Sequence, residues 1–467
     1  KIEACGGDGF FYALTTVKHL MDASGEKAVV QEAVITDYPA FPVRGIFEGA
    51  YGEWDIEGRL DVIEWMGSVK LNSFLYGPKG DAKIRRRWRE PYDDVELFNF
   101  KRMIEAARRN HIQFTYTIAP TLGFEFGSDE DFEALLSRVR QMQGLGVRSF
   151  ILAFDDTMAI MYNPGDREKF DNLGEAEAYV ANKLFDAMRE YDEDSVLVLV
   201  PEIYAGVYDI PYTRSLAEKL AEGVYIGWTG SEIGAPKIDS GSLVEFAEFY
   251  GKVPSLGDNW GSLYPLVERH SDIYKYTHQF TMNPYNLFGE MPVPGLESAS
   301  EPVLAPVECS AVAELGWNPG QYSPDSALDI LARRYFEPAG RDAFRWLMYR
   351  DYYGFTSYYT LDTDYMTPAE AAVRGILSST DGEQKKQLVA GLREPLEALA
   401  AGPGVIKENC KRADLGKVLA ARAENWRPYF EKLLEALDGV EKALPGPDEE
   451  LEESVESFIG VMKKEAE

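Results

Sequence analysis

The stretch Ser149-Phe150-Ile151-Leu152-Ala153-Phe154-Asp155-Asp156 is an apolar run of buried-strand length that ends in two adjacent carboxylates. Strands of a parallel barrel cross a covered core, so their interiors are apolar, and catalytic groups follow where each strand ends. Two neighbouring aspartates raise the proton affinity of at least one of them, which suits a site where one carboxyl stays ionised and the other donates a proton. The alternative is that either aspartate caps a helix or a turn.

The chain on both sides of this stretch alternates strands with helices. Between most strands lie helical segments with apolar residues three and four positions apart, such as Asp94–Arg109, Asp129–Leu145, Gly174–Tyr191 and Leu243–Tyr250. The eight candidate strands are Gly45–Glu48, Ser73–Tyr76, Gln113–Ile118, Ser149–Phe154, Val196–Val200, Val224–Trp228, Val253–Leu256 and Gln279–Met282. Over roughly 250 residues this pattern predicts an α/β fold, a (β/α)8 TIM barrel at residues 43–308. Its weakest part is the seventh crossover, because Leu263–Tyr276 is a poor helix.

The segments that flank the barrel predict two further parts. Residues 1–40 hold a strand at the start, a turn with three glycines, a helix at Phe11–Met21 and a strand at Val29–Ile35. We interpret them as the C-terminal part of a small α/β domain, since Lys1–Ala4 begins like a strand already in progress. After about Glu308 the strand signals stop, so residues 309–467 are expected to form a helical domain.

Composition limits the classes of function. The 467 residues leave room for two or three domains, and a net charge of -30 disfavours nucleic acid and anionic lipid surfaces as partners. Three scattered cysteines (Cys5, Cys309 and Cys410) and four histidines show no metal-ligand spacing, so we expect no catalytic metal and no cofactor. No apolar stretch approaches the ~20 residues needed to cross a bilayer, so we expect a soluble protein. The cellular compartment is not indicated.

Polar and aromatic side chains follow most of the predicted strands. A single one of them is more simply explained as a capped turn, but six on one rim favour a ligand site. Carboxylates, amides, tyrosines and tryptophans together suit a neutral, hydroxyl-rich ligand, whose ring faces stack on aromatic side chains. Carbohydrate is the natural candidate. The strand ends are Glu48–Gly52, Tyr76–Asp81, Pro201–Tyr204, Trp228–Gly230, Asp258–Trp260 and Asn283–Pro284.

Several of these segments resemble one known family. The motifs are Arg44-Gly45-Ile46-Phe47-Glu48-Gly49-Ala50-Tyr51-Gly52, Leu75–Asp81 with Trp88-Arg89-Glu90, Gly146–Phe150 leading into Asp155-Asp156, Trp228-Thr229-Gly230 and Trp317-Asn318-Pro319. In this order and spacing they are similar to the barrel of family 84 glycoside hydrolases, the O-GlcNAcase-type β-N-acetylglucosaminidases. The resemblance covers the end of the small domain, the whole barrel and the start of the helical domain.

The resemblance implies a substrate-assisted retaining mechanism, in which the carbonyl oxygen of the sugar's 2-acetamido group attacks the anomeric carbon. Asp155 would accept a hydrogen bond from the acetamido N–H, and Asp156 would act as general acid and then as base. Because neighbours on a regular strand point to opposite faces, both aspartates must lie where the strand breaks. The substrate-binding residues that the resemblance implies are Gly45, Lys79, Tyr204, Trp228, Asp258, Asn259 and Asn283.

Two departures from the family pattern concern residues that would bind the sugar hydroxyls. Gly257 replaces a usual tryptophan, and no aspartate follows Trp260, where the family has a carboxylate for the sugar hydroxyls; Ala50 also replaces a phenylalanine. The residues that could substitute for that carboxylate are Asp258, Trp260, Tyr264 and Glu290.

From the resemblance as a whole we expect an exo-acting β-N-acetylglucosaminidase that acts on terminal GlcNAc of glycans or glycoproteins. The alternatives are a relative that prefers GalNAc or an internal linkage, and a catalytically silent glycan-binding protein.

Overall fold

A computed structural model describes residues 1–24, 27–30, 32–49, 54–120, 123–156, 160–260, 264–284, 302–349 and 367–463 of the protein. The described residues fall into two compact units. The first contains residues up to Pro324, except Tyr264 and Pro265, which group with the second, and the second continues from Asp325.

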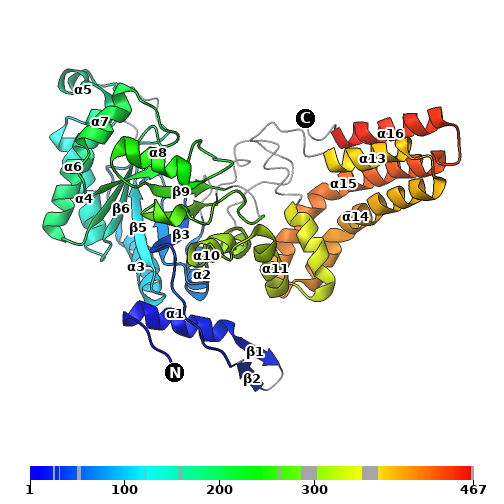
Figure 1. Ribbon diagram of the computed structural model, residues 1–467. Coiled ribbons are helices and arrows are strands. Elements are labelled where there is room, and N and C mark those ends of the chain that lie inside the picture. The colour runs from blue at the N-terminus through cyan, green and yellow to red at the C-terminus, as the bar shows by residue number, and fades with distance from the viewer. Residues whose placement is uncertain are drawn as a thin grey trace. The chain divides into compact units, whose positions relative to one another are not determined.

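The first unit contains the predicted barrel. Eight parallel strands close in the order β10-β3-β4-β5-β6-β7-β8-β9, which confirms the TIM-barrel fold (Figure 1). The strands are β3 (Val43–Glu48), β4 (Ser73–Tyr76), β5 (Gln113–Ile118), β6 (Ser149–Ala153), β7 (Val196–Val200), β8 (Val224–Trp228), β9 (Ser255–Asn259) and β10 (Gln279–Asn283). The largest difference from the prediction is β9, which begins two residues later and takes Asp258 and Asn259 into the strand.

Helices cover the outside of the barrel. They are α2 (Ile56–Ser68), α3 (Asp94–Arg109), α4 (Asp129–Gln143), α5 (Pro164–Lys169), α6 (Leu173–Tyr191), α7 (Pro211–Lys219) and α8 (Ser240–Tyr250). In the described part of the seventh crossover only a short 3-10 helix is present, η1 (Ile273–Lys275), as the poor periodicity there predicts. Local chemistry sets the boundaries. In α3, Asp93 and Glu96 form a capping box, and Gly251 ends α8 with a φ of 65°.

The barrel core is apolar because its strands are covered on both faces. Every residue of β4, β6 and β10 is buried. In α3 the buried side chains Phe100, Met103, Ala106 and Ala107 recur at three- and four-residue spacing, so one stripe of the helix faces the strands. The closed core leaves the loops at the carboxyl ends of the strands free to carry polar groups.

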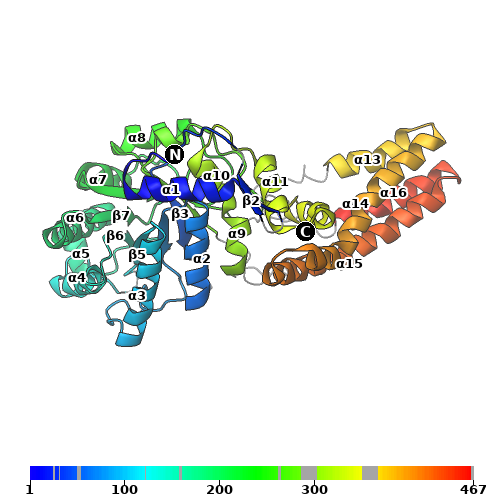
Figure 2. The same cartoon turned by 90° about the horizontal axis from the view of Figure 1, so that it is seen from below.

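The N-terminal segment differs from the prediction. It forms a helix, α1 (Gly6–His19), and an antiparallel hairpin of β1 (Met21–Ser24) and β2 (Lys27–Val30). Gly6, Gly7 and Gly9 lie inside α1 instead of a turn; Gly6 opens it with a φ of 71°. Residues 1–4 are not in a strand, since no strand among the described residues pairs with them. Helix α1 lies at the end of the barrel where the strands begin (Figure 2).

The second unit is helical, as predicted. Its described helices include α11 (Pro324–Tyr335), η4 (Pro338–Gly340), α13 (Thr367–Ser378), α14 (Gly382–Asn409), α15 (Ala413–Ala443) and α16 (Asp448–Lys463), and residues 341–349 are also helical. Val373, Leu437, Val440 and Val455 are among the side chains of its core. The preceding η3 (Pro302–Leu304), α9 (Ala305–Glu308) and α10 (Ser310–Trp317) belong to the first unit. No helix among the described residues is both long and apolar enough to cross a membrane.

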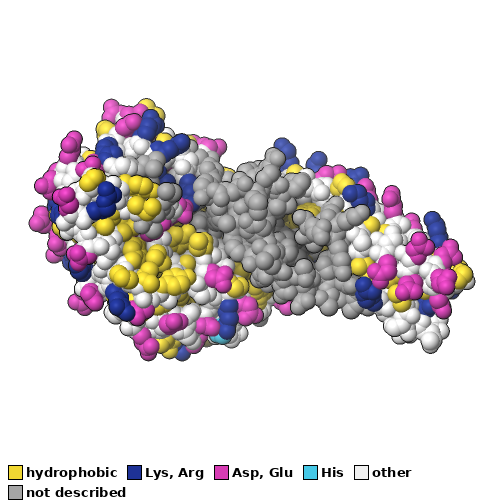
Figure 3. Space-filling view, turned by 90° about the horizontal axis from the view of Figure 1, so that it is seen from above, with side chains coloured by type: hydrophobic (Ala, Val, Ile, Leu, Met, Phe, Trp, Pro, Cys, Tyr) yellow, Lys and Arg dark blue, Asp and Glu magenta, His cyan; other side chains and the backbone are white. Residues whose placement is uncertain are grey.

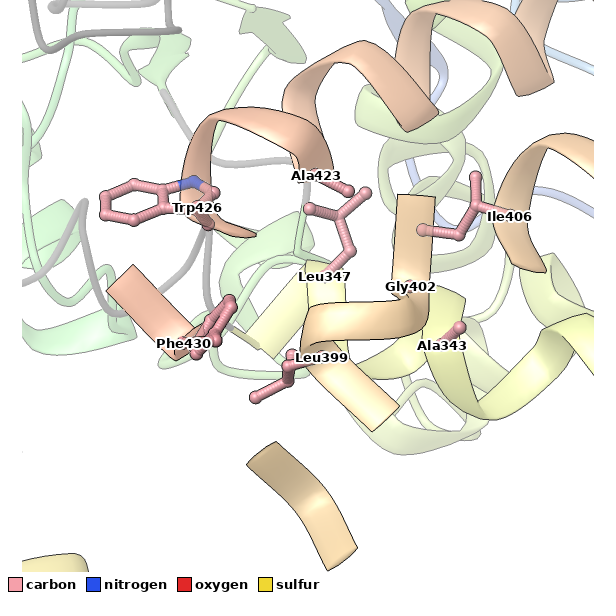
Figure 4. Close-up of a pocket in the computed structure, with 8 residues that line it drawn as sticks. All are labelled: Ala343, Leu347, Leu399, Gly402, Ile406, Ala423, Trp426 and Phe430. Atoms are coloured by element: carbon pink, nitrogen blue, oxygen red, sulfur yellow. The ribbon is translucent and has the colours of Figure 1, made fainter. Parts of the chain in front are cut away.

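An apolar cavity lies in the second unit between α14 and α15 (Figure 4). Leu399, Ile406, Ala423 and Phe430 are among the side chains that line it, and its volume is about 10 Å³. A space of this size holds at most one water molecule, and its walls carry no carboxylate. It is therefore not a candidate for sugar binding, in contrast to the polar strand ends of the barrel.

Candidate active site

The two adjacent aspartates lie where β6 breaks. The strand ends at Ala153, and Asp156 has a left-handed backbone with a φ of 59°. A non-glycine residue rarely adopts this conformation, and such strain concentrates at functional sites. It also frees the pair from strand alternation, so two neighbours can both present carboxylates at the rim. The side chain of Asp155 is 16% exposed and that of Asp156 is 36% exposed.

Asp155, the deeper carboxylate, is held by an arginine from the loop after β4. Nη2 of Arg85 donates to both carboxylate oxygens of Asp155 at 3.0 Å, and Nη1 donates to its backbone oxygen at 3.4 Å. Burial raises the pKa of Asp155; Arg85 opposes that rise and the neighbouring Asp156 adds to it. The pKa of Asp155 lies above its ordinary value as a result.

Asp156 has different partners. Nζ of Lys79 donates to Oδ2 of Asp156 at 2.5 Å, and the hydroxyl of Tyr204 lies 3.4 Å from Oδ1. Burial alone would raise the pKa of Asp156, but the charge and the hydrogen bond of Lys79 outweigh it, so this pKa is lowered. The structure therefore brings together four predicted site residues: Asp155, Asp156, Lys79 and Tyr204.

A network of hydrogen bonds positions the loop that carries Lys79. Oδ2 of Asp81 accepts hydrogen bonds from the hydroxyls of Tyr76 at 2.9 Å and Tyr92 at 2.7 Å. Oδ1 of Asp81 accepts the backbone N–H of Lys83 at 2.8 Å. Both tyrosines are buried, so the loop between β4 and α3 is anchored on the barrel wall, with Lys79 and Arg85 on either side of the anchor.

Two asparagines meet at the ends of β9 and β10. Nδ2 of Asn283 donates to Oδ1 of Asn259 at 3.0 Å, and Nδ2 of Asn259 donates to the backbone oxygen of Ile233 at 2.9 Å. Oδ1 of Asn283 is buried and has no hydrogen-bond partner in the part of the chain that the structure describes. This oxygen is available to a ligand hydroxyl.

Gly49, rather than Gly45, lies beside that oxygen. A Cβ on Gly49 would lie 3.0 Å from Oδ1 of Asn283, so only glycine leaves the approach open. Gly45 is the third residue of β3 and pairs with Ser73, whose carbonyl oxygen a Cβ would strike. Gly45 therefore allows close strand packing, and the sugar contact expected for its backbone stays a prediction.

Asp258 does not join the cluster at the strand ends. Arg269 binds both of its carboxylate oxygens at 2.8 Å, and the two side chains are 0% exposed. The same guanidinium donates to the backbone oxygens of Ala235 and Pro236, so Asp258 closes a clamp between two loops. Asp258 thus has a structural role in this clamp, and the substrate contact expected for it stays a prediction.

The remaining aromatic candidates are also enclosed. Trp228 packs on Phe246 of α8, and its Nε1 donates to the backbone oxygen of Gly206 at 2.9 Å. The substrate contact expected for Trp228 stays a prediction. Trp260 is 2% exposed and Tyr264 is 5% exposed. Glu290 lies outside the described residues. The substitutes proposed for the missing carboxylate are thus buried wherever the structure describes them.

Exposed apolar side chains also occur on the loops that follow the barrel strands. Ile160, Tyr162, Tyr208 and Ile233 come from the loops after β6, β7 and β8 and are each at least half exposed. Hydrophobic side chains gather on the first unit when it is seen from the side opposite α1, with Lys and Arg side chains at their margin (Figure 3). Aromatic faces beside charged donors suit sugar rings.

Comparison with known proteins agrees with this geometry. A family model described as beta-N-acetylglucosaminidase matches residues 44–348, which is more than half of the chain. The chain belongs to this family. The rat (Rattus norvegicus) and mouse (Mus musculus) Protein O-GlcNAcase are each 31% identical to it over 222 residues, covering 46% of this chain and 24% of theirs. The chain thus spans about a quarter of the length of these curated relatives.

Solved structures show the same fold at low sequence identity. A mutant of the Thermobaculum terrenum O-GlcNAc hydrolase matches with a TM-score of 0.73 and 22% identity, covering 91% of this chain and 90% of that one. CpGH84B matches with a TM-score of 0.78 and 22% identity, covering 97% of this chain and 78% of that one. Membership in this glycoside hydrolase family confirms the resemblance inferred from the sequence motifs.

Sequence reasoning missed three residues of this β-N-acetylglucosaminidase-family site: Arg85, Gly49 and Arg269. Arg85 had a signal, because Lys83-Ile84-Arg85-Arg86-Arg87-Trp88-Arg89 is a basic run directly after a strand end in a chain of net charge -30. Gly49 belongs to the same motif as Gly45, and its position at the end of β3 distinguishes it. Arg269 had no sequence signal, since its partner lies on the strand before a long crossover.

Proposed function

We propose that this chain is a retaining, exo-acting β-N-acetylglucosaminidase that removes terminal β-GlcNAc from glycans or glycoproteins by substrate-assisted catalysis. The observation that carries the proposal is the pair of adjacent carboxylates on a left-handed turn, each with its own cation. Such a pair can hold one proton and one negative charge at the reacting bond.

The roles of the two aspartates follow from how deeply each carboxylate is buried. Asp155 is the deeper carboxylate and is fixed by Arg85, so it is placed to accept the acetamido N–H and to stabilise the positive charge that develops on the cyclic intermediate. Asp156 is more exposed and faces Tyr204, so it is placed to protonate the leaving oxygen and later to deprotonate water. The acetamido oxygen attacks C1 while the glycosidic C–O bond breaks.

The ligand-free pair prefers the opposite distribution of charge. The pKa of Asp155 is raised and that of Asp156 is lowered, whereas the reaction needs Asp155 ionised and Asp156 protonated. We infer that the bound substrate reverses these two pKa directions. An acetamido N–H that donates to Asp155 favours the ionised form of Asp155. A sugar hydroxyl that accepts a hydrogen bond from Lys79 draws Lys79 away from Asp156, which raises the pKa of Asp156.

The rest of the sugar is expected to contact amides. Oδ1 of Asn283, with Gly49 beside it, can accept a sugar hydroxyl, and Asn259 orients the amide of Asn283. No carboxylate that the structure describes at the ends of β9 and β10 is exposed, because Asp258 is closed off by Arg269. This favours, as a second candidate, a hexosaminidase with weak discrimination between GlcNAc and GalNAc.

The direct test is hydrolysis of chromogenic β-GlcNAc and β-GalNAc glycosides. We expect turnover of β-GlcNAc, and a ratio of kcat/KM for the two sugars close to one would support the second candidate. Turnover of β-GalNAc alone would support a changed glycon preference. Silence on both, together with measurable GlcNAc binding, would contradict the enzymatic proposal and favour the catalytically silent glycan-binding protein.

A further inference from the structure

Glu177 is a carboxyl that the proposed reaction does not use, although it lies beside the active-site loops. It comes from α6 and is 0% exposed. Its Oε2 accepts a hydrogen bond from the hydroxyl of Tyr212 at 2.6 Å, whereas its Oε1 has no hydrogen-bond partner among the described residues. A buried carboxyl with an unpaired oxygen is costly to retain, so it calls for an explanation.

Tyr212 connects Glu177 to the loop after β7. The hydroxyl oxygen of Tyr212 lies 3.4 Å from the backbone N–H of Ile203, which donates toward it. The next residue is Tyr204, whose backbone oxygen accepts the N–H of Thr229 at 2.9 Å. The loop is therefore held from α6 and α7 on one side and from β8 on the other, and Tyr204 extends from it to Asp156.

We propose that Glu177 is a positioning residue for the reaction proposed above: through Tyr212 it holds the loop that presents Tyr204 to Asp156. The proposal rests on the proposed function for its kinetic consequence, but not for its structural one. Glu177 itself touches neither the carboxylate pair nor, in the proposed mechanism, the sugar.

The groups that face Glu177 make its charge state matter. They are Tyr212 on α7, Tyr250 on α8, Glu202 on the loop after β7 and Asp155 at the end of β6. Burial raises the pKa of Glu177 to about 8, although Tyr212 and the backbone of Glu202 stabilise the charged form. The neutral acid is therefore the form present at neutral pH. Ionisation places a charge in this buried position, close to Asp155 and Glu202, so at high pH conformations that expose Glu177 and loosen the loop become more favourable.

The structural experiment compares the parent with Glu177→Gln and Glu177→Ala in crystals at about pH 6.5 and about pH 9.5, on either side of the Glu177 titration. Gln keeps an oxygen for Tyr212 but cannot ionise. We expect Tyr204 to stay against Asp156 at both pH values in Glu177→Gln, to leave it at high pH in the parent, and to be displaced at both in Glu177→Ala. Tyr204 in the same place in every crystal would overturn the proposal.

The kinetic experiment follows kcat/KM for a chromogenic β-GlcNAc glycoside across the same pH range. The parent should lose activity as Glu177 ionises, Glu177→Gln should move this alkaline limb upward by about one pH unit, and Glu177→Ala should lower kcat about ten- to a hundredfold with little change in KM. Glu175→Gln is the matched control, since Glu175 lies on the same helix and pairs with Lys219. It should leave the limb in place.

The two experiments separate the two proposals. A parent that hydrolyses neither sugar refutes the proposed function, while the crystals still decide whether Glu177 places Tyr204. An active parent whose alkaline limb is the same in Glu177→Gln refutes the positioning role and leaves the proposed function standing.

Discussion

The carboxyl ends of β6 and β7 and those of β9 and β10 belong to one barrel rim, but the carboxylates at the two places differ in how deeply they are buried. At the first place Asp155 and Asp156 remain partly exposed beside separate cations. At the second place Asp258 is buried with Arg269, and the amides of Asn259 and Asn283 hydrogen-bond to each other. A carboxylate at the carboxyl end of a barrel strand is thus not always open to a ligand. What distinguishes the first pair is a strained turn that keeps both groups at the surface.

The largest expected effect separates the two aspartates of the first place. Asp156→Asn should lower kcat/KM by roughly 10²–10⁴-fold for a poor leaving group and much less for one that departs unprotonated. Asp155→Asn is its matched comparison and should slow good and poor leaving groups alike, because it weakens the attack of the acetamido oxygen. Rates measured over a series of aryl glycosides provide the test. Equal slopes for the two variants would contradict the assigned roles.

A substitution at the second place should lower the stability of the fold and leave the reaction rate nearly unchanged. Asp258→Asn leaves the Arg269 charge buried without its partner, which costs about 3–5 kcal/mol of unfolding free energy. Chemical denaturation measures this loss, and kcat/KM well below the transition should change little. Asp209→Asn, which removes an exposed ion pair with Arg214, is the control and should leave stability unchanged. A large loss of sugar binding in a stable Asp258→Asn protein would return Asp258 to the substrate site.

A change in pH dependence tests the cations of the first place. Lys79 lowers the pKa of both aspartates, so Lys79→Met raises both values, and the acid limb of kcat/KM should move to higher pH by about one unit. Overall activity should fall as well, because the sugar loses a donor. Lys83→Met, on the same loop but paired with Glu96, should leave the limb where it is. An unmoved acid limb in Lys79→Met would mean that Lys79 does not lower the pKa of Asp155, the carboxyl that must be ionised.

The smallest effect sharpens the role of the amides. Asn283→Ala removes the unpaired acceptor beside Gly49 and should raise KM by roughly five- to tenfold, the equivalent of one neutral hydrogen bond of about 1 kcal/mol. The value of kcat should stay within a factor of about two. Asn182→Ala, on the outer helix α6, serves as the control. If KM is unchanged while kcat falls, Asn283 acts on the reacting groups instead of the distal hydroxyls.

Much of this architecture could be predicted from the sequence, because buried parallel strands are apolar and their helices are amphipathic. The end of strand β9 could not be predicted in this way. Gly257 and Asp258 are not typical strand residues, and a buried Asp258 is tolerated only because it pairs with Arg269. The cluster of Asp155, Asp156, Lys79 and Tyr204 was predicted as separate motifs. Which cation binds which carboxylate depends on loop geometry, and no spacing in one sequence encodes it.

The central claim is that the sugar's own acetamido oxygen attacks, with Asp155 and Asp156 in support. The most direct measurement is kcat for β-glycosides whose 2-N-acyl group carries progressively more electron-withdrawing substituents, at a fixed leaving group. If the carbonyl oxygen is the nucleophile, kcat should fall steadily and by orders of magnitude as its basicity falls, and no sugar should become covalently attached to the protein. Rates that do not depend on the acyl substituent, or a sugar ester trapped on Asp155 or Asp156, would contradict the account.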